Sequence, residues 1–216
     1  MKIFIENVGL VNKADIEVNG ITVIGGYNNS GKSTILKAIY ALLYSNYEMK
    51  EKILEERKRS LIKILEHNDI LYALHYNSID IRKLNDIIFE KYYMDEGFSQ
   101  EEFSDFLKRG IGKTKKSATI LEDPDLFLNT TEPSEKQLSE LYDKIETIFK
   151  RSDSDYEKFI FTKYFHNIFV EKINTNNIKD SCKIEAEIDK TKSFAEFNEN
   201  TLVSYEKNIN RNRFQS

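Results

Sequence analysis

The residues best suited to chemistry in this sequence form one short stretch, Gly26-Tyr27-Asn28-Asn29-Ser30-Gly31-Lys32-Ser33-Thr34. A glycine, four free positions and then Gly-Lys-Ser is the spacing of a phosphate-binding loop. The glycines let backbone N–H groups point at phosphate oxygens, and the positive end of a helix dipole strengthens that attraction. Lys32 would reach the β- and γ-phosphates as the catalytic lysine, and Ser33 is the expected hydroxyl ligand of Mg²⁺, with Thr34 as the less favoured alternative.

The segments on either side of the stretch must position it. Ile21-Thr22-Val23-Ile24 is an apolar, β-branched run that predicts a buried parallel strand, and Thr34 to Leu43 has the apolar spacing of a helix. A strand before and a helix after are the context that a phosphate-binding loop needs. The alternative is a glycine-rich turn that only caps a helix, and the agreement of strand, loop and helix disfavours it.

Composition and charge narrow the class of protein. The chain has 216 residues, of which 40% are hydrophobic, so it can bury a sizeable core. Its net charge of −4 argues against broad attraction to nucleic acid phosphates unless positive charge is clustered. Cys182 is the only cysteine and has no metal-ligand spacing around it, which predicts a structural thiol. No apolar stretch is long enough to target or span a membrane, so we expect a cytoplasmic protein without a membrane partner.

The residues before the loop suggest a family. Lys2 to Asn7 and Ala14 to Val18 alternate apolar and polar side chains, which predicts two strands, and Asn19-Gly20 predicts a tight turn. This order of elements resembles the start of ABC-type ATPases of the RecF, SMC and OLD group. In that group a strand with an Asn-Phe-Gly-like end precedes the loop, and here the end is Asn7-Val8-Gly9.

The amino-acid sequence of the loop resembles that of one subgroup of this group. Tyr27-Asn28-Asn29-Ser30 looks like the Glu-Asn-Asn-Ser/Thr form of OLD-like ATPases, with Tyr27 in place of the usual Glu. The resemblance covers residues 1 to 44. It implies ATP and Mg²⁺ as ligands, and a dimer in which the facing subunit completes each loop. It also implies a glutamine that senses the γ-phosphate, for which Gln215 lies nearest the expected place.

Helical spacing replaces the strand pattern in the middle of the chain. Helices are predicted at 48–67, 79–93, 99–109, 135–150 and 155–174, and strands return at 183–189, 192–197 and 202–207. The expected fold is therefore α/β: a P-loop NTPase with an ABC-like first lobe, in which a mixed sheet includes an antiparallel meander. Residues 1–44 and 179–216 would form this nucleotide-binding lobe, and residues 45–178 a helical insertion.

Two further segments look like functional motifs. Gly112-Lys113-Thr114 lacks the upstream glycine of a second phosphate-binding loop, so the basic run 108–116 is predicted to be a solvated loop, with contact to nucleic acid as the alternative. Glu122 and Asp123 follow a short apolar run similar to the acidic strand that positions Mg²⁺ and water in the resembled ATPases. A turn at Pro124 is the preferred interpretation, because the run is short and no signature motif precedes it.

Aromatic and histidine side chains on the predicted helices favour structural roles. The stripe Tyr156, Phe159, Ile160, Lys163, Tyr164 and Asn167 keeps helical spacing, which favours packing over base stacking. Three histidines lack metal-ligand spacing: His67, His75 and His166.

Two classes of function follow. The first is the lobe of an ABC-type ATPase that acts in DNA repair, nucleic acid transactions or defence against mobile DNA. Without an acidic strand and signature motif it would be incomplete alone, and a second ATPase lobe or a second copy of the chain would supply the rest. The second is a nucleotide-dependent interaction module with no turnover of its own. Nucleic acid and an effector protein are further expected partners.

Overall fold

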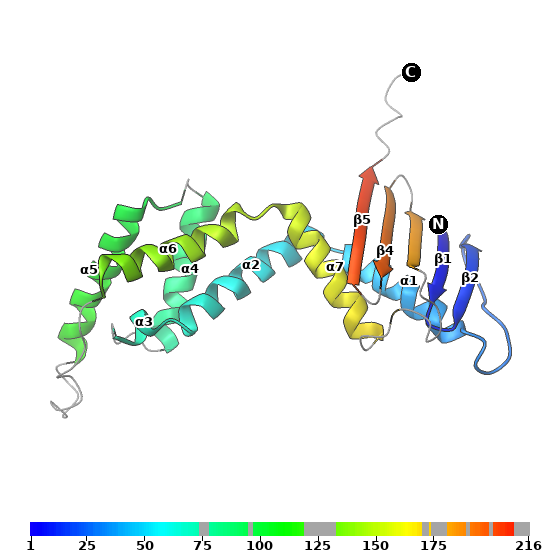
Figure 1. The fold of residues 1–216 in the computed structure, drawn as a ribbon, viewed down its shortest axis with the longest axis horizontal. Coiled ribbons are helices and arrows are strands. Elements are labelled where there is room, and N and C mark those ends of the chain that lie inside the picture. The colour runs from blue at the N-terminus through cyan, green and yellow to red at the C-terminus, as the bar shows by residue number, and fades with distance from the viewer. Residues whose placement is uncertain are drawn as a thin grey trace, which may run out of the picture. The chain divides into compact units, whose positions relative to one another are not determined.

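The computed structural model describes residues 1–73, 78–94, 97–118, 133–169, 173, 181–188, 191–198 and 201–209. The chain divides into two compact units, residues 1–50 with 154–216, and residues 51–153. Among the described residues, the first unit holds the sheet and two helices, and the second holds five helices (Figure 1). The strands are β1 (Lys2–Val8), β2 (Val11–Glu17), β3 (Cys182–Ile188), β4 (Thr191–Asn198) and β5 (Thr201–Ile209). The helices are α1 (Lys32–Asn46), α2 (Met49–Glu66), α3 (Asp69–Ala73), α4 (Ser78–Met94), α5 (Gln100–Ala118), α6 (Glu135–Lys150) and α7 (Asp153–Phe169).

The sheet has the order β2-β1-β3-β4-β5, and every neighbouring pair is antiparallel. Ile5 on β1 lies opposite Ala14 on β2 and Ile184 on β3, so strands that are far apart in the sequence are direct neighbours. The meander expected after residue 182 is present as β3, β4 and β5. The expected mixed sheet is wrong for the described residues, because all of their strand pairs are antiparallel.

One face of the sheet is apolar and is covered by α1 and α7. Strict alternation along the strands brings Ile3, Ile5, Ile184, Ala195 and Phe197 to this face, where all are fully buried or nearly so. Helix α1 adds Ala38, Ala41 and Leu42, and α7 adds Phe161, Phe165 and Phe169. These buried residues form the core of the sheet unit.

Helix α7 differs from its prediction in two respects. It packs in the sheet unit, although the sequence pattern placed it in the insertion of residues 45–178. Tyr156 and Ile160 are buried as expected, but the helix face turned to the sheet carries Phe161 and Phe165, whose rings lie 4.5 Å apart, while Phe159 is 45% exposed. Aromatic residues stand on several faces of α7, so helical spacing alone could not select the buried one.

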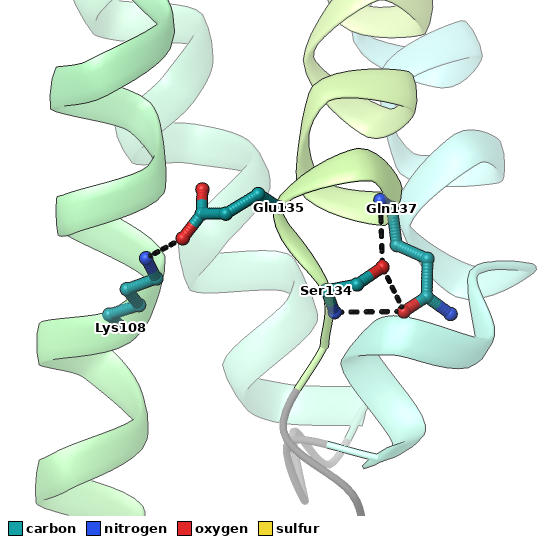
Figure 2. Close-up of polar contacts among 4 residues, drawn as sticks. All are labelled: Lys108, Ser134, Glu135 and Gln137. Carbon is teal, nitrogen blue, oxygen red and sulfur yellow. Dashed lines mark hydrogen bonds and ion pairs between the residues drawn. The ribbon is translucent and has the colours of Figure 1, made fainter.

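The helical unit has its own core. Leu61 and Leu65 of α2, Ile88 of α4, and Phe103 and Leu107 of α5 are fully buried or nearly so. A capping box begins α6: the Gln137 N–H donates to Ser134 Oγ over 3.3 Å, and the Ser134 N–H donates to Gln137 Oε1 over 2.9 Å (Figure 2). Within the described part of residues 45–178 there are helices and no strand.

The basic run of residues 108–116 is helical, which makes the expected solvated loop wrong. Its backbone continues α5 to Ala118. Phe103 and Leu107, one helical turn apart, are both buried and fix α5 in the unit. Lysine favours helices, and a glycine costs only about 1 kcal/mol there, so Gly110 and Gly112 do not end the helix.

The expected third strand is also wrong. Residues 21–24 form no strand and pair with none of the described strands. Ile21 is 95% exposed and Val23 is 87% exposed. A parallel strand is stable only between neighbouring strands and covering layers, and the described residues offer this segment neither. In the part of the chain that the structure describes, no helix is long and apolar enough to cross a membrane.

Candidate functional site

The glycine-rich loop, residues 26–34, leads directly into α1. Gly31 is the N-cap residue in a left-handed conformation (φ 86°), and no side chain caps the first N–H groups of the helix. The first turn of α1 also contains no acidic residue, unlike the first turns of α2, α5 and α6. These N–H groups therefore face no carboxylate of their own turn, which is the arrangement that suits an anionic ligand.

The ammonium group of Lys32 lies inside the loop. Its Nζ donates to the carbonyl oxygen of Gly26 over 2.7 Å, to the carbonyl oxygen of Tyr27, and to Ser30 Oγ over 3.4 Å. These contacts hold a positive charge where the loop closes over the start of α1. A phosphate entering the loop would meet both the ammonium group and the free helix N–H groups.

Two glycines leave the space that this geometry needs. A Cβ atom at Gly26 would lie 2.8 Å from Ser30 Oγ and 3.8 Å from Lys32 Cδ, so a side chain there would enter the loop. A Cβ atom at Gly31 would lie 2.9 Å from Val11 Cγ2. The loop is therefore packed against the start of β2, and the left-handed backbone of Gly31 adds to the need for glycine.

The turn between β1 and β2 packs against Thr34 at the end of the loop. Gly9 lies so close to Thr34 that a Cβ atom at Gly9 would come within 2.8 Å of Thr34 Cγ2. The Gly9 N–H donates to the carbonyl oxygen of Ile173 over 2.8 Å. The Thr34 side chain thus packs against Gly9 in the β1–β2 turn, whereas Ser33 is exposed on the first turn of α1. This arrangement favours Ser33 over Thr34 as a ligand of Mg²⁺.

The loop fits the phosphates of a nucleotide more completely than it fits a metal ion. Helix N–H groups and the Lys32 ammonium are donors of the kind and charge that phosphate oxygens accept from. The Ser33 hydroxyl is the exposed candidate ligand for a metal ion on the first turn of α1, and no group of three or more acidic, histidine or cysteine side chains in the described ranges could hold an ion. Glu122, Asp123 and Gln215 lie outside the described residues.

The remaining loop residues are open to solvent. Tyr27 is 93% exposed, and Asn28, Asn29 and Ser30 are exposed as well. Asn29 has a left-handed backbone (φ 64°), a conformation that asparagine tolerates better than most residues. These residues are therefore placed to contact a ligand or a partner rather than the core.

The other candidate residues carry no chemistry related to the loop. Cys182 is fully buried on β3, and burial raises the pKa of its thiol to about 12, so it is neutral and unreactive in the folded protein. The His67 ring nitrogen Nδ1 lies 3.0 Å from the carbonyl oxygen of Lys63. His166 lies on α7, and His75 lies outside the described residues.

A separate cavity of about 660 Å³ lies between α5 and α6 in the helical unit. Hydroxyl and carboxylate groups line it, and Lys108 forms an ion pair with Glu135 at this position (Figure 2). Asp105 is paired with Arg109 over 3.5 Å. Because Asp105 and Glu135 already have cationic partners and the loop belongs to the other unit, we assign the cavity no part in binding nucleotide.

Helix α1 has a second apolar face that was not predicted from the sequence. Leu36 and Tyr40 are each 56% exposed, on the side of the helix away from the buried alanines. The Tyr40 and Tyr44 rings stack with centroids 5.4 Å apart, and Tyr44 meets Tyr164 edge-on at 5.0 Å. The signal was present in the sequence, because apolar residues surround this helix. A helix that is apolar all round is typical of a buried position between two layers.

Comparison with known proteins identifies the family. A model of the AAA domain family matches residues 2–215. No curated protein and no solved structure gives a significant match. The match extends over nearly the whole chain, including the loop, α1 and the five strands. The chain therefore belongs to the AAA domain family of P-loop ATPases, which bind nucleotide, usually with Mg²⁺.

Proposed function

We propose that the chain is the nucleotide-binding lobe of an ABC-type ATPase of the RecF, SMC and OLD-like group, and that the loop of residues 26–34 binds ATP with Mg²⁺. The observation that carries this proposal is the Lys32 ammonium, held by the carbonyl groups of Gly26 and Tyr27 at the uncapped start of α1. Membership of the AAA domain family supports the same ligand.

Gly26, Lys32, Ser33 and the first N–H groups of α1 have definite parts in this proposal. The first N–H groups of α1 and the Lys32 ammonium take the β- and γ-phosphates, with Lys32 exchanging carbonyl oxygens for phosphate oxygens. The exposed Ser33 hydroxyl takes Mg²⁺, which neutralises phosphate charge when it is bound. Gly26 keeps the loop open because a side chain there would contact Ser30.

We further propose that a second ATPase lobe, or a second copy of this chain, covers the exposed side of α1. Leu36 and Tyr40 on α1, and Ile21 and Val23 before the loop, are apolar and largely exposed. A strand from the covering lobe would pair with residues 21–24, and its layer would bury the outer face of α1. Efficient turnover then depends on that lobe, in a role in DNA repair, nucleic acid transactions or defence against mobile DNA.

Calorimetric titration of the purified chain with MgATP tests the binding site. Lys32→Ala should weaken ATP binding by about tenfold or more, because a charge-assisted contact to phosphate is lost. Lys37→Ala, which removes an exposed lysine one turn further along α1, is the matched control and should leave affinity unchanged. Circular dichroism checks that both variants fold. Unchanged affinity in a folded Lys32→Ala protein would refute the phosphate-binding assignment.

A turnover assay tests the second lobe. The isolated chain should bind MgATP and hydrolyse it very slowly, because stabilising phosphoryl transfer takes several groups acting together. Adding the covering lobe should restore turnover, and Tyr40→Ala should weaken that effect without changing ATP affinity. Hydrolysis at about 1 s⁻¹ or faster by the isolated chain would contradict the need for a second lobe and leave nucleotide binding intact.

A further inference from the structure

The solvent-facing side of the sheet carries an ordered pattern of charge. Side chains alternate along each strand, so cross-strand partners on one face stand in rows that run across all five strands. Two of these rows alternate lysine with glutamate: one contains Glu17, Lys2, Glu187 and Lys192, and the other contains Lys13, Glu6, Lys183 and Glu196. Every carboxylate in these two rows therefore stands opposite a lysine.

Some of these opposed pairs are close enough to interact directly. Lys192 Nζ lies 3.8 Å from Glu187 Oε2, and Lys183 Nζ lies 4.0 Å from Glu196 Oε1. The two rows are thus largely balanced within the sheet, and surface pairs of this kind need no outside partner.

The row between them is different. It consists of Asp15, Phe4, Glu185, Phe194 and Glu206, taken across β2, β1, β3, β4 and β5. We call it the acidic–aromatic row. Its phenyl rings stand on β1 and β4, the strands that carry Lys2 and Lys192 in the first of the neighbouring rows. The three carboxylates are exposed, the two rings are half-buried, and none of these carboxylates takes part in an ion pair within the described part of the chain.

The charge of the whole face selects the class of partner. Its seven carboxylates, on Glu6, Asp15, Glu17, Glu185, Glu187, Glu196 and Glu206, face four lysines, Lys2, Lys13, Lys183 and Lys192. An acidic face repels nucleic acid and anionic lipid, and it attracts a basic polypeptide. The ring of Phe4 already accepts a cation, because Lys13 Nζ lies 5.6 Å from its centroid.

The spacing of the row selects the form of the partner. Neighbouring strands lie about 4.8 Å apart, so successive carboxylates of the row are about 10 Å apart with a ring between them. An α-helix presents the same face every seven residues, about 10.5 Å along its axis. A helix laid across the strands can therefore bring basic residues i, i+7 and i+14 over Asp15, Glu185 and Glu206. Its apolar residues at the intermediate turns then meet Phe4 and Phe194.

We propose that the acidic–aromatic row binds a basic amphipathic helix of a partner polypeptide, laid across the strands. The surface lies on the opposite side of the sheet from α1, whose buried residues pack on the inner face. It is therefore separate from the nucleotide site and from the exposed side of α1. An effector could occupy it while a second lobe covers α1.

A designed peptide pair tests the spacing. The probe is a synthetic helix of about 22 residues, roughly 33 Å long, with three lysines spaced seven apart and leucines on the turns between them. The control peptide has the same composition with its lysines spread around the helix. Fluorescence anisotropy with the full chain should show about tenfold tighter binding of the probe. Equal affinity for both peptides would overturn the proposal.

A pair of double variants tests the row. Glu185→Gln with Glu206→Gln should weaken probe binding by about tenfold, because both changes remove charge under the peptide lysines. Glu187→Gln with Glu196→Gln removes the same charge from the same face and is the matched control, with an expected loss of less than about threefold. Equal losses in the two variants would show that only overall acidity matters, and they would overturn the assignment to this row.

Discussion

Strand β1 and the segment of residues 21–24 have similar composition and opposite surroundings. Both are rich in isoleucine and other residues that favour strands. Ile3 and Ile5 of β1 are 1% and 0% exposed, whereas Ile21 and Val23 are 95% and 87% exposed. The difference is the neighbours: β1 pairs with β2 and β3 and is covered by α1 and α7, while the other segment pairs with no described strand. The residue types of a segment therefore determine its preference for a strand, and neighbouring strands and helices determine whether it is buried.

The comparison also assigns a driving force to the exposed segment. Burying an isoleucine or valine side chain contributes about 1.5 to 3 kcal/mol. Strand β1 has already gained this free energy within the sheet unit. Residues 21–24 have not, so this free energy is available to any partner that covers them, such as the second lobe proposed above. Substitutions in the two segments should therefore act on different equilibria.

The largest expected effect separates these two equilibria. Ile5→Ala removes buried methyl groups from the core of the sheet unit and should lower the free energy of unfolding by about 2 to 5 kcal/mol. Ile21→Ala should change it by less than about 0.5 kcal/mol, because the side chain is exposed. Urea denaturation of the isolated chain measures both. A loss above about 1 kcal/mol for Ile21→Ala would mean that the segment is buried in solution, and the comparison would fail.

The next effect extends the comparison to two left-handed glycines. Gly31→Ala should cost about 1 to 3 kcal/mol, because its backbone is left-handed and the new Cβ atom would press on Val11. Gly20 is also left-handed (φ 70°) but has nothing within 4 Å of a Cβ atom. Gly20→Ala should therefore cost only the backbone strain of about 1 kcal/mol. Thermal unfolding of both variants checks the ranking, and a larger loss at Gly20 would contradict the packing of the loop against β2.

Proton linkage at Cys182 should give an effect that appears only at alkaline pH. Burial, together with the nearby Glu196 carboxylate, raises the pKa of this thiol to about 12, while an unfolded cysteine has a pKa of about 8.5. Its contribution to stability is fully present below pH 8.5 and is lost as pH rises toward 12, by up to about 1.4 kcal/mol per pH unit. Cys182→Ala should flatten the slope of unfolding free energy between pH 8.5 and 10.

A cysteine placed in the exposed segment provides the control for Cys182. In a Cys182→Ala background, Val23→Cys should react with iodoacetamide at the rate of an unfolded thiol, because this position is exposed. Native Cys182 should react only when the sheet opens. Equal reaction rates for the two thiols at pH 8 would show that β3 is accessible in the folded protein.

Local patterns were sufficient where the deciding contacts are local. The alternation of β3 and β4, the limits of α2 and α6, and the position of the loop before α1 all follow from spacing over fewer than about twenty residues. The contacts of Lys32 with Gly26, Tyr27 and Ser30 also span only a few residues. Such features can be predicted because the sequence contains both partners within one short window.

Features that depend on distant partners could not be predicted in this way. Gly9 contacts Thr34, although β2 and the loop separate the two residues in the sequence. No local pattern indicates that contact. On α7, the Phe161 ring is buried against Phe197 and Tyr205, which lie on strands later in the chain. Residues 21–24 were predicted to be buried because composition cannot show whether neighbouring strands exist.

The pairing of β1 with β3 has a consequence for synthesis on the ribosome. β1 leaves the ribosome before the helical unit, whereas its partner β3 follows only after that unit. At 5 to 20 residues per second, β1 waits roughly 10 to 35 s for that strand. The helical unit is continuous in sequence and rich in local contacts, so we expect it to fold first, while the β1–β2 hairpin stays marginal until β3 docks. A nascent chain arrested before Cys182 should therefore show protected helices and an exposed, aggregation-prone first hairpin.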